Sequence, residues 1–372
     1  MPARHVYVHV PFCARRCVYC DFAIAVRRDV PLDEFISRLR SEISLRFSTP
    51  PALPARSFYL GGGTPSRLGA GGIERVLETL DRHWLREPGA EVTIEANPED
   101  VTTRVATAWK GAGVTRVSLG VQSFSPAVLD WMHRTHDVSS IHRAVEAVRQ
   151  AGIERLSIDL IFALPEALGR AWEADLDCAV QLEPDHVSAY GLTVEEGTPL
   201  FRSRRRGQTA EAPDAAYAAE FLRADAFLTA AGFEHYEVSN YAKPGAQAVH
   251  NSAYWTHAEY AGLGPSAHEF VQGLRRWNER DYATWRRVLA EGIDPIAGSE
   301  RLTTEQLALE ALFLGLRTAN GVVWDEGDRE IVRGWTDMGW AKVDGNRVKL
   351  TPEGWLRTNA LVAALTERRS RY

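Results

Sequence analysis

Residues 5–20 read His5-Val-Tyr-Val-His-Val-Pro-Phe-Cys13-Ala-Arg-Arg-Cys17-Val-Tyr-Cys20, a short alternating run that leads directly into three cysteines. The alternation predicts a strand at residues 5–10, so the cysteines are expected on one tight loop just past its carboxyl end. The chain has 4 cysteines, and a disulfide framework would spread them along the sequence. Crowded thiols indicate a metal site instead, because soft thiolates select zinc, Cu(I) or iron–sulfur clusters.

The spacing of the three cysteines favours a [4Fe–4S] cluster over zinc. A structural zinc ion takes four protein ligands, and only His9 or Asp21 stands near enough to be the fourth. A cubane held by three cysteines has one iron without a protein ligand. The amino and carboxylate groups of S-adenosylmethionine (SAM) can chelate that open iron. The remaining cysteine, Cys178, lies in a helical pattern and is expected to be a small buried hydrophobe.

Bulk composition is typical of a globular protein with a large core. The 372 residues carry a formal net charge of −6 and are 45% hydrophobic, which gives no basis for binding nucleic acid. The length suggests two domains, or one large barrel with an appendage. No apolar run has the roughly 20 residues of a membrane span, and no signal peptide is apparent. The sequence therefore predicts a soluble cytoplasmic protein.

Strand and helix patterns alternate over the first two-thirds of the chain. Six β-rich runs are predicted at residues 5–10, 57–60, 91–95, 116–119, 156–161 and 186–191. Between them lie helical patterns, such as residues 33–47, where apolar side chains recur every three or four positions. Such alternation builds a parallel sheet, and six units are fewer than the eight of a closed barrel. We therefore predict an α/β fold, a partial (β/α)6 barrel, in preference to a doubly wound sheet.

Polar and glycine-rich motifs follow four of these predicted strands, at residues 61–64, 95–98, 120–123 and 159–165. Ligands of parallel α/β proteins bind at the carboxyl ends of the strands. Each motif alone could be a turn or a helix cap. Together, at successive strand ends, they predict one ligand cradle.

The chain after the sixth strand is expected to form further parts. An arginine-rich loop at residues 202–206 is followed by a long helix at residues 213–231 and then by an aromatic stretch. From about residue 300 the pattern changes to helices and a hairpin at residues 341–350, turning at Asp344–Gly345. We predict a radical-SAM-type partial barrel at residues 1–230, an aromatic-rich extension at 231–298 and a small winged-helix-like domain at 299–372.

From residue 5 to the C-terminus the sequence resembles radical SAM proteins related to oxygen-independent coproporphyrinogen III oxidase. The CxxxCxxC spacing is the superfamily signature, and the flanking HxPFC and YCDF point to this branch. The resemblance implies a [4Fe–4S] cluster ligated by Cys13, Cys17 and Cys20, with SAM on its open iron. It also implies a set of SAM-binding residues: Tyr7, Tyr19, Gly62, Gly63, Thr64, Glu95, Gln122, Arg134 and Asp159.

In that set each residue type suits its expected partner. Gly62, Gly63 and Thr64 would let the backbone approach the SAM amino group closely. Glu95, Gln122 and Asp159 suit the ribose hydroxyls or the ammonium, and Arg134 suits the methionine carboxylate. Tyr7 and Tyr19 would flank the cluster and SAM.

Two functions compete within this branch. The oxidase carries a further cysteine two residues past the third one, where this chain has Phe22, and an additional segment ahead of its first strand. The sequence His250-Asn251-Ser-Ala-Tyr254-Trp255 resembles the HNxxYW motif of the heme chaperone HemW family. This resemblance implies a protein that binds heme and delivers it to acceptor proteins, with an electron donor for the cluster. The alternative is anaerobic oxidative decarboxylation of coproporphyrinogen III, and a scaffold with a vestigial cluster is a third possibility.

The heme ligand is expected within or near the HNxxYW motif. His250 is the predicted axial ligand, because imidazole is a common iron donor in heme proteins, and Asn251, Tyr254 and Trp255 are predicted to border the macrocycle. The arginines of residues 202–206 could meet the propionates. The rival ligands are His5, His9, His257 and His268. Aromatic residues at this spacing are otherwise typical of a core, and an arginine run is otherwise a solvated loop.

Overall fold

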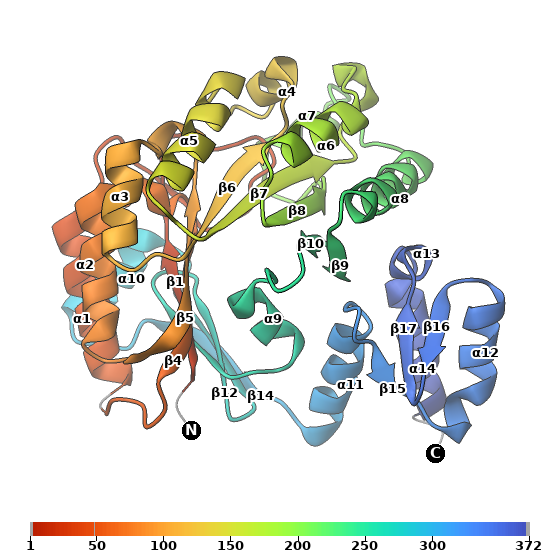
Figure 1. Ribbon diagram of the computed structural model, residues 1–372. Coiled ribbons are helices and arrows are strands. Elements are labelled where there is room, and N and C mark those ends of the chain that lie inside the picture. The colour runs from red at the N-terminus through yellow and green to blue at the C-terminus, as the bar shows by residue number, and fades with distance from the viewer. Residues whose placement is uncertain (1–2, 48, 370–372) are drawn as a thin grey trace.

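The computed structural model describes residues 3–47 and 49–369, which form one continuous α/β arrangement (Figure 1). A twelve-stranded sheet runs in the order β14-β13-β12-β11-β1-β4-β5-β6-β7-β8-β10-β9. Its two edge strands, β14 and β9, do not pair with each other, so the sheet curves without closing. The predicted α/β class and partial barrel are confirmed.

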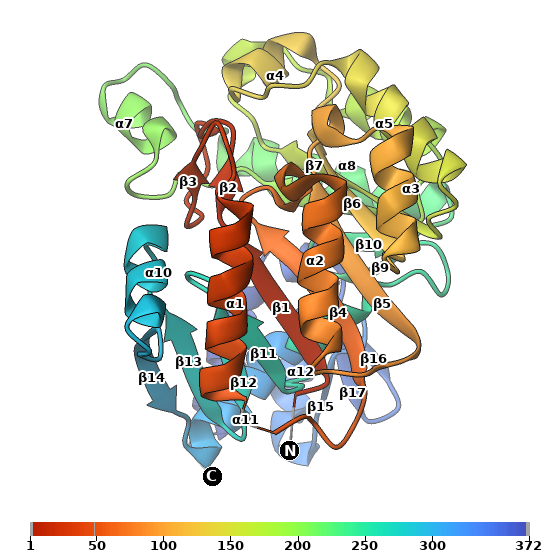
Figure 2. The same cartoon turned by 90° about the vertical axis from the view of Figure 1, so that its left-hand side faces the viewer.

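Six parallel strands form the centre of the sheet, in chain order from β1 to β8. They are β1 (His5–Val10), β4 (Ala55–Gly62), β5 (Arg86–Ala96), β6 (Arg116–Gln122), β7 (Arg155–Phe162) and β8 (His186–Gly191). The helices between them cover the convex face: α1 (Leu32–Arg46), α2 (Gly69–Asp81), α3 (Thr103–Gly111), α5 (Val138–Gln150) and α6 (Trp172–Gln181) (Figure 2). Each predicted strand is present, several of them longer than expected.

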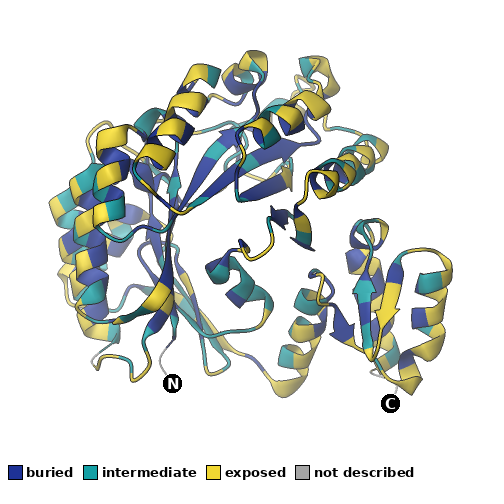
Figure 3. Cartoon of the chain, in the orientation of Figure 1, coloured by how far each residue is buried: buried dark blue, intermediate teal, exposed yellow. Residues whose placement is uncertain are grey.

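Side chains alternate along these strands between the helix-covered face and the concave face. In β5, Val92 and Ile94 are fully buried against the outer helices, while Thr93 and Glu95 face the hollow of the barrel. The same alternation recurs in β6, β7 and β8, because side chains of a strand have a period of two. Apolar packing therefore holds the helices outside, and the concave face is left polar. Figure 3 shows the strands dark blue and the outer surfaces of the helices yellow.

Residues 234–301 extend the sheet at both edges, which the sequence analysis did not predict. On one edge β11 (Tyr260–Leu263) pairs in parallel with β1, followed by the antiparallel strands β12 (His268–Val271), β13 (Leu274–Asn278) and β14 (Ile296–Arg301). On the other, β10 (Asn240–Ala242) pairs with β8 and β9 (Glu234–Glu237). Helix α8 (Asp214–Ala230) precedes β9, α10 (Tyr282–Ala290) packs on α1, and α9 (Val249–Trp255) lies on the concave side (Figure 1).

A buried charged network fastens the first edge to α1. Glu42 is fully buried and accepts hydrogen bonds from Arg46, Asn278, the Trp285 indole and the Gly264 amide. Arg46 also pairs with Glu269 of β12 at 2.9 Å. Removal of one partner would leave buried polar groups uncompensated, so the loss of a single member should destabilise the docking of β11–β14.

The C-terminal part is a set of helices around a three-stranded sheet, in which the expected hairpin at residues 341–350 is joined by the strand β15. Its elements are α11 (Thr304–Gly315), β15 (Val322–Val323), α12 (Arg329–Asp337), β16 (Ala341–Asp344), β17 (Arg347–Leu350), α13 (Pro352–Trp355) and α14 (Thr358–Arg369). The hairpin β16–β17 turns at Asp344–Gly345, and Gly345 has a φ of 58°, which glycine adopts without strain. Among the described residues no helix combines the length and apolar character needed to cross a lipid bilayer.

Candidate functional site

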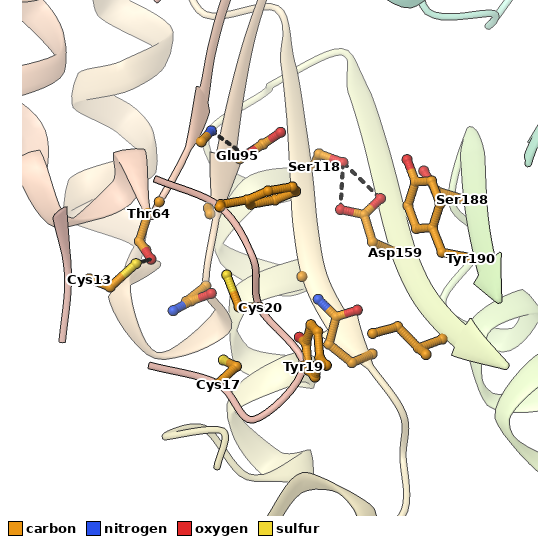
Figure 4. Close-up of a pocket in the computed structure, with 18 of the residues that line it drawn as sticks. Cys13, Cys17, Tyr19, Cys20, Thr64, Glu95, Ser118, Asp159, Ser188 and Tyr190 are labelled. Atoms are coloured by element: carbon orange, nitrogen blue, oxygen red, sulfur yellow. Dashed lines mark hydrogen bonds between the residues drawn. The ribbon is translucent and has the colours of Figure 1, made fainter. Parts of the chain in front are cut away.

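The three cysteines lie on a loop at the carboxyl edge of the barrel. The short strands β2 (Phe12–Cys13) and β3 (Ala25–Val26) pair in parallel and close this loop at its base. Cys13 is buried, and Cys17 and Cys20 are half-buried. All three line one cavity of about 380 Å³ that opens into the hollow of the barrel (Figure 4). The fold therefore brings the cysteines together at the edge where ligands of such sheets bind.

The environment of Cys13 and Cys20 favours the neutral thiol. Burial raises the pKa of Cys13, and it raises the pKa of Cys20 to about 11. The Thr64 hydroxyl lies 3.4 Å from Cys13 Sγ, and Arg134 Nη1 donates to Cys17 Sγ at 3.6 Å. Among the described residues no three His, Cys, Asp or Glu side chains converge as they would on a single metal ion. The thiols surround the mouth of the cavity, a donor set that suits a multi-iron cluster.

Two carboxylates, Glu95 and Asp159, face the same cavity as the cysteine loop (Figure 4). Glu95 of β5 accepts a hydrogen bond from the Tyr59 hydroxyl at 2.7 Å and another from the Gly62 amide at 3.0 Å. Asp159 of β7 accepts from the Ser118 hydroxyl at 3.0 Å. Burial, and for Glu95 also the nearby Asp159, raises the pKa of Glu95 to about 7 and that of Asp159 to about 6. Both carboxylates can therefore accept from the hydroxyl or ammonium groups of a ligand near neutral pH.

A bulge at the end of β6 turns Gln122 into the same cavity. The register shifts between Gly120 and Gln122, and Gln122 has a φ of 69°, in the left-handed region that non-glycine residues rarely occupy. A Cβ on Gly120 would lie 3.0 Å from the Gln122 amide nitrogen and 3.2 Å from Arg134. Arg134 donates to Asn97 Oδ1 at 2.6 Å and to the Gly120 carbonyl at 2.7 Å. The bulge thus places Gln122 and Arg134 side by side.

Packing against the neighbouring strand requires glycine in the turn after β4, whether or not a ligand binds there. Gly62 has a φ of 108°, and a Cβ there would lie 2.5 Å from the His9 ring. A Cβ on Gly63 would lie 2.7 Å from the backbone of Pro11. Gly62, Gly63 and Thr64 all line the cavity. Glycine at these positions lets β4 end directly against the strand that carries the cysteine loop.

The two predicted tyrosines occupy different places. Tyr19 lines the cavity with the cysteines. Tyr7 lies in a neighbouring cavity with His9 and Tyr254, and its hydroxyl is 3.1 Å from His9 Nδ1. The structure therefore does not bring Tyr7 into the cysteine cavity, although Glu95 and Gly62 border both cavities.

The HNxxYW residues lie on α9 and face in several directions. His250 is 1% exposed, and both of its ring nitrogens are engaged, Nδ1 with Ser57 Oγ at 2.8 Å and Nε2 with the Tyr254 hydroxyl at 2.9 Å. Burial lowers the pKa of His250 to about 3, so its ring is neutral. Asn251 borders the cysteine cavity, Tyr254 the cavity of Tyr7, and Trp255 a third cavity of about 630 Å³. In this arrangement His250 offers no free nitrogen to an iron atom.

The rival histidines differ in access. His5 and His9 are buried and hydrogen-bonded, His5 to Ser57 and His9 to the Ala23 carbonyl. His257 lines the third cavity and lies 3.2 Å from Glu310, and His268 is exposed beside the cavity of Tyr254. Of these histidines, His257 and His268 are the accessible ones.

The arginine-rich segment lies beside the cysteine loop and not beside α9. It forms the short helix α7 (Pro199–Arg205), and the Leu200 amide donates to the Val18 carbonyl at 2.8 Å (Figure 2). The structure therefore does not place these arginines near the HNxxYW residues.

Sequence reasoning missed most of the polar side chains inside the barrel. The inner positions of β5–β8 are occupied by Thr93, Arg116, Ser118, Ser157, His186, Ser188 and Tyr190, all of which line the cavity. Their signal is the period-two alternation of each strand, which marks every second residue as facing the hollow. Asn97, which holds Arg134, follows β5 and belongs to a motif that the sequence did reveal.

Comparisons with known proteins agree with this fold. Residues 7–178 match the Radical SAM superfamily. In three dimensions the chain is similar to "Coproporphyrinogen III oxidase (HemN)" from Escherichia coli, with a TM-score of 0.80 and 21% identity, covering 97% of this chain and 89% of that one. At this identity the likeness establishes the fold alone.

The curated relatives are more similar in sequence. Over 366 residues the chain is 37% identical to "Heme chaperone HemW" of Mycobacterium tuberculosis, covering 97% of this chain and 94% of that protein. It is 31% identical over 322 residues to "Heme chaperone HemW" of Bacillus subtilis, covering 86% and 84%. It is also 34% identical over 349 residues to "Radical S-adenosyl methionine domain-containing protein 1, mitochondrial" of Mus musculus, covering 91% and 78%.

Proposed function

The chain belongs to the HemW family of radical SAM proteins, and on this premise we propose that it binds heme and delivers it to acceptor proteins. The observation that carries the proposal is the alignment with a named heme chaperone over 97% of this chain and 94% of the relative. The resemblance read from the HNxxYW motif points to the same function. The acceptor protein and the electron donor are further expected partners.

The proposed cofactor site is a [4Fe–4S] cluster on Cys13, Cys17 and Cys20. When bound, such a cluster with SAM on its open iron supplies one-electron reductive chemistry. This chain's own residues would orient SAM: Glu95 and Asp159 would accept from its hydroxyl or ammonium groups. The mutual position of these residues around one cavity supports the assignment.

Arg134 has a different proposed role from the one that its sequence motif suggests. Its guanidinium already donates to Asn97, to the Gly120 carbonyl and to Cys17. Its Nε is buried and has no partner among the described residues. We propose that Arg134 positions the cysteine loop and offers the methionine carboxylate of SAM its two remaining N–H groups, one on Nε and one on Nη1.

Two histidines are candidates for the axial heme ligand, and they differ in the contacts that each would give up to bind iron. His250, predicted from the HNxxYW motif, would have to give up its hydrogen bonds to Ser57 and Tyr254 and leave a fully buried place. His257 lies on the cavity that Trp255 also lines, where a planar ligand could stack. Binding through His257 would give up the contact of its buried Nε2 with Glu310, whereas His250 would give up two hydrogen bonds. The smaller loss favours His257, and the family motif favours His250.

Heme titration of matched variants tests the proposal and separates the two candidates. We expect purified wild-type protein to bind heme stoichiometrically, with a Soret band characteristic of the bound species, and to transfer it to an apo-heme protein. His257→Ala is expected to alter the Soret band and weaken binding, and His142→Ala, on the exposed face of α5, serves as the control. Loss of binding in His250→Ala with unchanged thermal stability would favour the motif ligand instead. Absence of stoichiometric heme binding by the wild-type protein would refute the chaperone proposal.

The coproporphyrinogen oxidase alternative is disfavoured by one side chain. Phe22 occupies the position of the oxidase's additional cysteine and is 58% exposed beside the cysteine loop.

We propose that the chain is divided into three parts, with boundaries at residues 230 and 298. The central part would be an integral extension of the barrel, because β9 to β14 belong to the same sheet as β1 and β4–β8.

A further inference from the structure

The cysteine cavity continues deeper into the barrel than the two carboxylates. Its lining includes Thr93 and Arg116, which are paired in register on β5 and β6. Glu95 stands two residues further along β5 and therefore about 7 Å nearer the carboxyl edge. A lower compartment, defined by Thr93, Arg116, Asn240 and Asn251, thus lies beneath the proposed SAM site.

Three polar atoms in the lower compartment have no hydrogen-bond partner among the described residues. They are Thr93 Oγ1, Arg116 Nη1 and Asn240 Oδ1, and their side chains belong to residues that are 1%, 3% and 2% exposed. A buried donor or acceptor without a partner destabilises the folded state, so these groups are expected to be satisfied by something that occupies the space. Three such atoms at one end of one cavity mark a site for a polar ligand.

The Arg116 guanidinium is held in a fixed orientation. Its Nε donates to Glu91 at 3.0 Å, and its Nη2 donates to the carbonyls of Ala246 at 2.8 Å and Gln247 at 3.3 Å. These bonds leave the Nη1 group as the free donor of the fork. Glu91 is held in turn by the amides of Val249 and His250 at the start of α9. A preorganised guanidinium is the side chain best suited to an oxygen anion such as a carboxylate.

We propose that the lower compartment binds a carboxylate, with Arg116 Nη1 and the Thr93 hydroxyl as donors to its oxygens. Asn240 Oδ1 accepts from a donor group of the ligand, and Asn251 closes the compartment from α9. The carboxylate is that of a small free acid or an arm of a larger ligand, and the two sources share this recognition. The inference goes beyond heme delivery and holds whether or not the protein binds heme.

Binding of propionate tests the inference, because propionate is a small carboxylate with a short aliphatic stem. We would titrate reconstituted, SAM-loaded protein with propionate and with the neutral amide propionamide, and follow saturation-transfer difference NMR signals. Saturable binding of propionate and not of propionamide is expected. If propionate does not bind, or binds no better than propionamide, the compartment holds only water and the inference is wrong.

The Thr93→Val variant tests whether propionate binds in the lower compartment. Valine has the shape of threonine, and the Thr93 hydroxyl makes no hydrogen bond in the described structure, so folding should be retained. We expect propionate affinity to fall about three- to tenfold in Thr93→Val, as for loss of one hydrogen bond. Thr107→Val, on the exposed surface of α3, should leave the affinity unchanged. Equal affinities of the two variants would overturn the assignment.

A competition experiment identifies the source of the carboxylate. If heme displaces propionate from the wild-type protein, the carboxylate belongs to a heme propionate. If heme and propionate bind independently, a separate small acid is the ligand. Failure of heme binding would refute the proposed chaperone function and leave the propionate result standing.

Discussion

SAM affinity should depend on pH through Glu95. The SAM-free protein holds the pKa of Glu95 at about 7, mainly because the carboxyl is buried. An acid with this pKa is about one-tenth ionised at pH 6 and about nine-tenths ionised at pH 8. SAM is cationic and requires an acceptor, so it binds the ionised form. Affinity should therefore rise about tenfold between pH 6 and pH 8, which corresponds to about 1.4 kcal/mol.

The stability of the SAM-free protein should change in the opposite direction. The pKa of Glu95 is raised from 4.5 to about 7 on folding, so the native state retains a proton that the unfolded chain releases. Stability of the SAM-free protein is therefore lost as pH rises from about 4.5 through 7. Stabilisation by SAM should increase over the upper part of the same range.

Isothermal titration calorimetry of SAM at pH 6, 7 and 8 measures the effect on reconstituted protein. Glu95→Gln retains an oxygen acceptor for the Tyr59 hydroxyl but cannot ionise. Its SAM affinity should resemble that of the protonated wild-type protein and should lose most of its pH dependence. Asp159, with a pKa of about 6, accounts for a smaller dependence at lower pH. If the SAM affinity of Glu95→Gln depends on pH as strongly as that of the wild-type protein, Glu95 is not the group that sets this dependence.

Three other predictions concern the cluster, the glycine turn and the buried network. Alanine at any of the three loop cysteines should abolish the visible absorbance of the reconstituted cluster, whereas Cys178→Ala, outside the cavity, should retain it. Gly62→Ala would place a Cβ 2.5 Å from the His9 imidazole and should destabilise the fold by more than about 2 kcal/mol. Gly71→Ala in α2, which has open space around it, should be tolerated. Urea unfolding measures the stability of both variants. In the same assay Glu42→Ala should cost about 3–5 kcal/mol, because it removes the buried carboxylate that Arg46, Asn278, Trp285 and the Gly264 amide share. Glu34→Ala, at a half-exposed ion pair, should cost less than about 1 kcal/mol.

The central barrel could be predicted from the sequence because its signals are local. Each of the six strands alternates with a helix whose apolar positions recur every three or four residues, and the motifs fall where parallel strands end. Strand β11 escaped prediction because it is short and pairs with β1, more than 200 residues earlier, and the antiparallel strands β12–β14 are added to it. Their docking depends on Glu42 and Arg46, residues that look like an ordinary surface helix pair in the sequence.

The site was predictable to the extent that it consists of motifs. The cysteine loop, Glu95, Gln122 and Asp159 face one cavity, as expected from successive strand ends. The orientation of α9 was not predictable, because it depends on the buried contact of His250 with Ser57, which lies 193 residues earlier. Motif spacing gives residues in order along the chain and does not give the direction in which a short helix faces.

One anaerobic preparation, divided between two assays, decides whether the protein is a heme chaperone or a coproporphyrinogen oxidase. Protein reconstituted with iron and sulfide is given SAM, a strong reductant and coproporphyrinogen III, and the products are separated by chromatography. A second portion is titrated with heme. We predict stoichiometric heme binding and no decarboxylated product. Decarboxylated product would contradict the proposed chaperone function and would make the protein an oxidase that works with Phe22 in place of the additional cysteine.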